Sequence, residues 1–212
     1  MTDHTSGTPA ADRAPGQDPV TSNPEAVRAG AAAVFDLDAR LPGQVFRELG
    51  DEVVFCGFDT LLTPEAWPAI AALAAVHGDR QVDLLVVEAH GVSGEALSLP
   101  VRATPDDYWA RVGFGPEPGP ADLESITIAA QVVALTGPSG RWGCWGERDP
   151  EVAVVRGFPD QAARAQWHTR YGPCVDAAGA LASWLPPAFG SRPVPDAYAA
   201  QLTTGYAAPQ RG

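Results

Sequence analysis

The most patterned stretch of the chain, residues 141–156, reads RWGCWGERDPEVAVVR and predicts a β-hairpin. Its first arm, residues 142–146, carries two tryptophans, and its second arm, residues 151–156, is a run of mostly β-branched side chains. Asp149 and Pro150 between the arms are typical of a turn, because Asp can bond its own backbone and Pro presets φ. We expect this hairpin at the centre of the fold.

Two further apolar runs, at residues 51–58 and 82–88, predict buried strands on either side of a helix. A strand, a helix and a strand of these lengths imply a right-handed crossover and therefore a parallel pair. Residues 125–135 alternate in polarity, which predicts a strand that joins the hairpin in an antiparallel meander, although a helix also fits this segment. The expected fold is α+β, in which a mixed sheet with one βαβ parallel pair and a three-stranded meander is flanked by helices.

Start and stop signals place helices around this sheet. Asn23 is a candidate N-cap with Pro24 at the first helical position, and glycines follow several of the other segments. The predicted helices cover residues 24–35, 42–49, 63–76, 104–113, 160–171, 174–185 and 197–206. Residues 95–102 predict one more strand, at an edge of the sheet because Pro100 has no amide hydrogen for a neighbouring strand.

The first 22 residues differ in composition from the rest of the chain. They mix Thr, Ser, Gly, Pro and Asp without periodic apolar positions, so they cannot bury enough surface to offset the entropy lost on ordering. We therefore predict a disordered N-terminal tail at residues 1–22. A single α+β domain is expected over residues 23–206, followed by a short C-terminal tail at residues 207–212.

The charge of the chain excludes several classes of function. The formal net charge is −12, which repels phosphate backbones, because nucleic-acid affinity comes largely from basic side chains that displace counterions. All 14 basic residues are Arg. The lack of Lys removes Schiff-base chemistry and the phosphate-binding lysine of P-loops. Direct binding of DNA or RNA is therefore not expected.

Three cysteines, Cys56, Cys144 and Cys174, are far apart and odd in number. This spacing predicts reduced, mostly buried thiols, with neither a disulfide framework nor a zinc motif. No basic segment followed by an apolar core stands at the N-terminus, and the longest apolar run, at residues 69–76, is too short to span a bilayer. We expect a cytoplasmic protein without a membrane segment, a metal or a cofactor.

Residues 34–41, VFDLDARL, resemble the first motif of haloacid dehalogenase-type phosphohydrolases. In that motif an apolar strand ends in two acids, which Asp36 and Asp38 would match, and a Gly-Thr turn follows. Here Ala39 and Arg40 replace the turn, and the segment before Asp36 is predicted to be a helix. We therefore assign the two acids to a loop at the end of a helix.

A candidate catalytic site follows from the expected parallel pair. The carboxyl ends of neighbouring parallel strands open on one edge of a sheet, where ligands bind in open α/β folds. Asp59 would leave one strand, and Glu88 and His90 the other. A carboxylate beside an imidazole could act as a general base with its orienting group. A small hydrolase or transferase that uses these three residues is the alternative function.

The hairpin supports a binding function. Trp142 and Trp145 should point to opposite faces, so that one is buried while the other is partly exposed beside Glu147 and Arg148. Tryptophan and arginine are the usual anchors of protein interfaces. Alternatively, helices cover both rings and Glu147 pairs with a nearby arginine to fix the corner.

The predicted function is that of a non-enzymatic acidic protein that binds a partner. The WGxWGERDxEVAVV pattern is similar to small α+β proteins of GC-rich bacteria, some of which act as immunity proteins against toxins. This resemblance implies a protein partner. The negative field of the chain would steer it toward a basic one. The predicted contact residues are Trp142, Trp145, Glu147 and Arg148.

Overall fold

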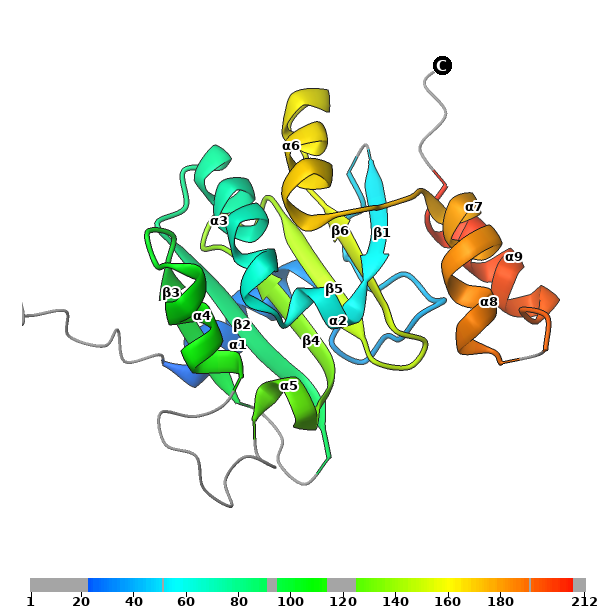
Figure 1. Cartoon of the computed structure of the whole chain (residues 1–212), viewed down its shortest axis with the longest axis horizontal. Coiled ribbons are helices and arrows are strands. Elements are labelled where there is room, and N and C mark those ends of the chain that lie inside the picture. The colour runs from blue at the N-terminus through cyan, green and yellow to red at the C-terminus, as the bar shows by residue number, and fades with distance from the viewer. Residues whose placement is uncertain (1–22, 51, 91–94, 114–124, 191, 208–212) are drawn as a thin grey trace, which may run out of the picture.

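A computed structural model describes residues 23–50, 52–90, 95–113, 125–190 and 192–207. Its centre is a six-stranded sheet in the order β1-β6-β5-β4-β2-β3, with helices on both faces (Figure 1). The strands are β1 (Val53–Gly57), β2 (Gln81–Ala89), β3 (Ala96–Pro100), β4 (Ala130–Thr136), β5 (Gly143–Glu147) and β6 (Val152–Arg156). The predicted disordered tail at residues 1–22 and all but the first residue of the predicted C-terminal tail lie outside the described residues.

The predicted mixed sheet with a parallel βαβ pair is wrong, because every neighbouring pair of strands is antiparallel. The α+β class itself is correct. Strands β1 and β2 do run in the same direction, but β6, β5 and β4 lie between them. The chain leaves β1, crosses one face of the sheet through a helix and enters β2 four positions further on. A crossover helix fixes the direction of the next strand but not how many places remain open between the two.

The predicted hairpin and meander are confirmed. Strands β4, β5 and β6 follow one another in the chain and pair antiparallel, with Ala134 opposite Trp145 and Trp145 opposite Val154. The segment predicted as strand or helix contains both, because α5 (Ile126–Ala129) precedes β4. Strand β3 is confirmed as an edge strand that ends at Pro100.

Most helices begin where the sequence signals place them. Asn23 caps α1 through its side chain, and Thr104 forms a capping box with Asp107 at the start of α4. The long helices are α1 (Pro24–Val34), α3 (Trp67–Val76), α4 (Pro105–Val112), α6 (Gln161–Tyr171) and α9 (Asp196–Gly205). Shorter helical segments are α2 (Phe58–Leu61), η1 (Pro64–Ala66), α7 (Ala177–Gly179), η3 (Ala180–Trp184) and α8 (Leu185–Ala188).

The predicted helix at residues 42–49 is wrong. Phe46 instead pairs with Phe35 in an isolated β-bridge, and the Tyr206 hydroxyl accepts a hydrogen bond from the amide of Val45 and donates one to the carbonyl of Gly43. The apolar side chains of Val45 and Phe46 are buried against the sheet from this extended backbone. A tyrosine 161 residues beyond Val45 in the chain therefore supplies hydrogen-bond partners that a helix would have supplied locally.

The sheet separates two apolar clusters, which alternate along each strand. One cluster contains Trp142 and Cys144 and is covered by α3, α4 and α6, while the other contains Trp145 and is covered by α1, the loop at residues 35–46 and α9. Trp142 and Trp145 thus point to opposite faces, as predicted. Each indole donates to a carboxylate: Trp142 Nε1 to Asp79 at 2.8 Å and Trp145 Nε1 to Glu147 at 2.7 Å.

The prediction of three reduced cysteines is wrong for two of them. Cys56 on β1 and Cys174, between α6 and α7, form a disulfide across 118 residues of chain, and Cys144 is a buried free thiol. The pairing brings β1 together with the segment that follows α6. Spacing along the chain contains no signal for a contact of this kind, because the fold alone decides which distant residues meet.

Replacing Asp79 should weaken the fold. Its carboxylate accepts hydrogen bonds from the Ser139 amide, the Ser139 hydroxyl and the Trp142 indole. We expect Asp79→Ala to lower the free energy of unfolding by about 2–4 kcal/mol, because buried donors lose their acceptor. Urea denaturation measures this. Asp106→Ala, at an exposed position in the first turn of α4, should cost less than about 1 kcal/mol, and an equal loss in both variants would contradict the role of Asp79.

Candidate functional site: the charged end of the sheet

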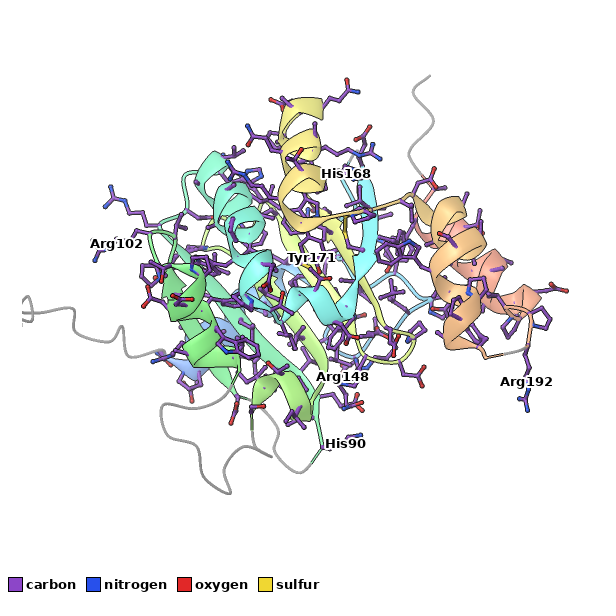
Figure 2. The ribbon with its side chains drawn as sticks, in the orientation of Figure 1. His90, Arg102, Arg148, His168, Tyr171 and Arg192 are labelled. Atoms are coloured by element: carbon purple, nitrogen blue, oxygen red, sulfur yellow. A yellow bond between two sulfur atoms is a disulfide. The ribbon has the colours of Figure 1, made fainter. Side chains whose placement is uncertain are left out.

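Charged side chains gather where β1, β5 and β2 end. These three strands run in the same direction, so their carboxyl ends lie at one end of the sheet, where Figure 2 shows Arg148 and His90. We call this region the charged end; it consists of Asp38, Arg40, Asp59, Glu88, Glu147, Arg148, Asp149 and Glu151. It spans β1 to β2, which is four strand spacings, or roughly 19 Å.

Glu147, the last residue of β5, is the buried centre of this region, with 3% of its surface exposed. Its Oε1 atom accepts hydrogen bonds from the Leu41 amide at 2.8 Å and from the Trp145 indole at 2.7 Å. Burial raises the pKa of the Glu147 carboxyl above its usual range, although these two hydrogen bonds and the charge of Arg40 oppose the shift. Glu147 therefore fastens the loop at residues 35–46 to the central strand.

Arg40 connects the same loop to β2. Its guanidinium donates from both Nε and Nη2 to Glu88 Oε2, at 3.3 and 2.8 Å, and from Nη1 to the carbonyls of Leu37 and Ala39. It also lies 5.8 Å from the centre of the Trp145 ring. Most of the N–H groups of Arg40 therefore donate to atoms of the protein, and its guanidinium stabilises the loop.

Arg148 has a comparable role beside β4 and α5. It donates to the carbonyls of Ala130 and Thr127 at 2.9 and 2.5 Å, where a positive charge suits the carboxyl end of a helix. Its guanidinium lies 5.0 Å from the ring of Phe58 and 3.9 Å from Asp59. Arg148 thus holds α5 to the end of the sheet, and Asp59 keeps 75% of its side chain exposed.

The structure does not bring the predicted catalytic residues together. Asp59 follows β1 and Glu88 ends β2, so the width of the sheet separates them, and each pairs with a different arginine. His90 is exposed, and its backbone amide donates to the carbonyl of Ala129. The carboxyl ends of β1 and β2 do lie at the same end of the sheet, as predicted. The prediction assumed adjacency that the antiparallel order removes.

Both tryptophans of the predicted binding set are buried, with 0% of their surface exposed. Trp142 and Trp145 therefore offer no ring to a partner, and the arrangement matches the alternative in which both are packed in the interior. Glu147 is buried with them but accepts from backbone and indole donors instead of pairing directly with an arginine. Of the predicted set, Arg148 alone is partly exposed.

Sequence reasoning missed two contributors to this end. Arg40 and Tyr198 on α9 are distant in the chain from the hairpin, so the sequence contains no local signal that places them here. The Tyr198 hydroxyl is buried and has no hydrogen-bond partner among the described residues, and burial, together with the negative charges of Glu147 and Asp149, raises the pKa of the phenol. The Asp36 side chain forms a local turn by accepting from the Asp38 amide, as expected for a loop after a helix.

Two cavities lie away from the charged end. One of about 330 Å³ lies between Val53, Asp176 and Tyr206, and one of about 540 Å³ lies beside α6 near His168. Neither is lined by Asp59, Glu88 or His90. Within the described ranges, no group of three or more His, Cys, Asp or Glu side chains is placed to hold a metal ion.

Comparison of the chain with protein-family models, with curated proteins and with solved structures found no match. The charged end is therefore interpreted from its own chemistry. In its buried part Glu147 accepts hydrogen bonds from the Leu41 amide and the Trp145 indole, and its exposed part is a row of carboxylates.

Two substitutions of Glu147 should distinguish the contribution of its hydrogen bonds to stability from the contribution of its charge. Glu147→Ala leaves the Leu41 amide and the Trp145 indole without an acceptor, so we expect it to lower the free energy of unfolding by about 2–4 kcal/mol. Glu147→Gln keeps an acceptor oxygen and should cost less. Urea denaturation of both variants measures the difference, and equal losses would show that the two hydrogen bonds contribute little.

The same Glu147→Gln variant tests the raised pKa. A carboxyl whose folded pKa is raised stabilises the fold fully below its unfolded pKa, about 4.3, and this contribution is lost as pH rises through the folded value. Glutamine does not titrate. We therefore expect the stability of Glu147→Gln relative to the parent chain to increase from about pH 4 toward neutrality, as measured by urea denaturation across this range. A difference that is constant with pH would contradict the assignment.

Glu151 is strained, because this non-glycine residue has φ of 63° in the turn between β5 and β6. The left-handed region costs a residue with a Cβ about 1 kcal/mol. Its amide donates to the Arg148 carbonyl, and its carbonyl accepts from the Phe58 amide. We expect Glu151→Gly to leave stability unchanged or raise it by up to about 1 kcal/mol, in thermal denaturation. A loss would show that the Glu151 side chain itself supports the turn.

Proposed function

We propose that this chain is a non-enzymatic acidic protein that binds a basic protein partner on the charged end of its sheet. The observation that supports this most is the excess of exposed carboxylates over arginines at this end. Arg40 and Arg148 each donate to two backbone carbonyls as well as pairing with Glu88 and Asp59, whereas five carboxylates remain exposed. The exposed acids are Asp38, Asp59, Glu88, Asp149 and Glu151.

The size of this surface suits a protein partner. The region extends over roughly 19 Å, which is wide enough to form part of one side of a standard protein interface, whose area is about 800 Å² per partner. The chain carries a net charge of −12, so its field draws in a positively charged partner and repels nucleic acid. Arg40 and Arg148 hold Glu88 and Asp59 in place before binding, which reduces the entropy that these two side chains lose in the complex.

An immunity-like role, in which the protein neutralises a basic toxin of bacterial origin, fits this surface and the sequence resemblance. We further propose that the protein acts in the cytoplasm. None of the helices in the described part of the chain has the length and apolar character needed to cross a lipid bilayer. A cytoplasmic protein seldom keeps a permanent disulfide, so the Cys56–Cys174 bond would be transient there.

Neutralising the outer acids should abolish capture of the partner. The triple variant Asp38→Asn, Asp149→Asn, Glu151→Gln removes three charges whose carboxylates accept no hydrogen bond within the described residues. We expect the immobilised parent chain to retain a basic protein from a lysate of its own cells and the triple variant to lose it. Capture should weaken as salt is raised from about 0.05 to 0.3 M, because screening shortens the reach of exposed charges.

A matched control removes the same charge elsewhere. Glu48, Asp106 and Asp160 are exposed and lie near the opposite end of the sheet, and Asp160→Asn keeps the cap of α6. The variant Glu48→Gln, Asp106→Asn, Asp160→Asn should capture the partner as the parent does. If both triple variants lose it equally, net charge and not the charged end governs binding. Capture of an acidic protein would contradict the proposal.

A further inference from the structure

The segment between α6 and α7, residues 172–176, crosses the outer edge of the sheet. Figure 1 shows the chain passing from α6 over β6 and β1 to α7. Val175 pairs with Phe55 of β1 through two backbone hydrogen bonds of 2.7 and 2.9 Å, and Cys174 is bonded to Cys56. We call residues 172–176 the strap. It covers the outward-facing backbone of an edge strand.

We propose that the Cys56–Cys174 disulfide is a redox-controlled latch, which a cellular dithiol opens to release the strap from the edge of β1. The two sulfurs differ in a way that suits this role. Cys174 has 8% of its surface exposed, whereas Cys56 is fully buried. An incoming reductant therefore reaches Cys174 first.

The exchange balances with a dithiol as the only co-reactant. One thiolate of the dithiol attacks Cys174 Sγ, the bond to Cys56 breaks, and Cys56 leaves as a thiolate that takes up a proton. The second thiol of the dithiol then attacks the other sulfur of the same dithiol, which is bonded to Cys174 in the mixed disulfide, and releases Cys174 as a thiolate that takes up a proton. Two electrons pass to the protein, and the dithiol becomes a disulfide. The Trp167 indole lies 3.5 Å from Cys56 Sγ and donates to it, which stabilises the buried leaving group.

Reduction leaves the strap with few contacts to β1. The two backbone hydrogen bonds between Phe55 and Val175 remain, and the Tyr171 hydroxyl at the end of α6 donates to the Gly57 carbonyl at 2.8 Å. Opening of the strap exposes the outer amide and carbonyl of Phe55. The 330 Å³ cavity already borders the strap at Asp176 and reaches β1 at Val53, so opening extends an existing groove along the strand.

Reduction of the disulfide would not expose the backbone of the central strands of the sheet. Strands β4 and β5 lie between other strands, and their side chains are buried on both faces. Cys144 on β5 is a fully buried thiol that takes no part in the bond. It therefore reports whether a thiol reagent enters through local opening of the strap or through global unfolding. The latch is independent of the partner proposed for the charged end.

Native reduction followed by alkylation tests the latch. We expect dithiothreitol, without denaturant, to reduce the bond, and iodoacetamide then to label Cys174 before Cys144. In a short deuterium pulse, exchange at the amides of Phe55 and Val175 should rise by on the order of tenfold or more on reduction, while those of Val133 and Cys144 stay protected. Oxidised glutathione should restore the original exchange.

Three results would overturn the proposal. The bond could resist reduction until the protein unfolds, all three cysteines could be labelled together, or the strap could stay protected after reduction. Cys174→Ser provides a second route, since it should show the open exchange pattern without reductant. Should this variant fail to fold, reduction of the parent chain still decides the question. Ala182→Ser, at an exposed position, serves as the control for a surface serine.

Discussion

The sheet depends on two buried carboxylates, each of which accepts a hydrogen bond from an indole of the central hairpin. Asp79 serves Trp142 on one face, and Glu147 serves Trp145 on the other. Two large rings at the centre of a sheet that is covered on both sides bury much apolar surface, but each has an N–H group that cannot reach water. The two acids satisfy these groups, and each also fixes a loop, through Ser139 and Leu41 respectively.

This arrangement links the interior to the surface at the charged end. Glu147 fixes the loop at residues 35–46 by accepting a hydrogen bond from the Leu41 amide. Arg40 of that loop then donates to Glu88 near the end of β2. Tyr206 supports the same loop from α9. The position of the exposed Glu88 carboxylate is thus a consequence of a buried polar contact.

Local signals in the sequence predicted the local structure well. The caps of α1 and α4, the β4-β5-β6 meander and the edge position of β3 each depend on residues that are close in the chain. Errors arose where distant segments meet. The insertion of three strands between β1 and β2, the pairing of Cys56 with Cys174 and the support of Val45 by Tyr206 have no local signature.

The candidate site shows the same division. Acids and arginines near strand ends were recognisable, and Asp59, Glu88 and Arg148 do lie at one end of the sheet. Which carboxylate is buried and which is exposed could not be predicted. Alternation along β5 places Glu147 on the same face as Trp145. That face is interior because α1, α9 and the loop at residues 35–46 cover it, which the sequence does not show. The same covering explains why Trp145 is not at the surface.

The two borders of the sheet are closed by different means. On one side the last strand, β3, ends in a proline, which has no amide hydrogen to offer to an approaching chain. On the other side Val175 already occupies the backbone groups of Phe55. In the described part of the chain each border is therefore interrupted at one point, which disfavours the edge-to-edge pairing of identical molecules that leads to fibrils.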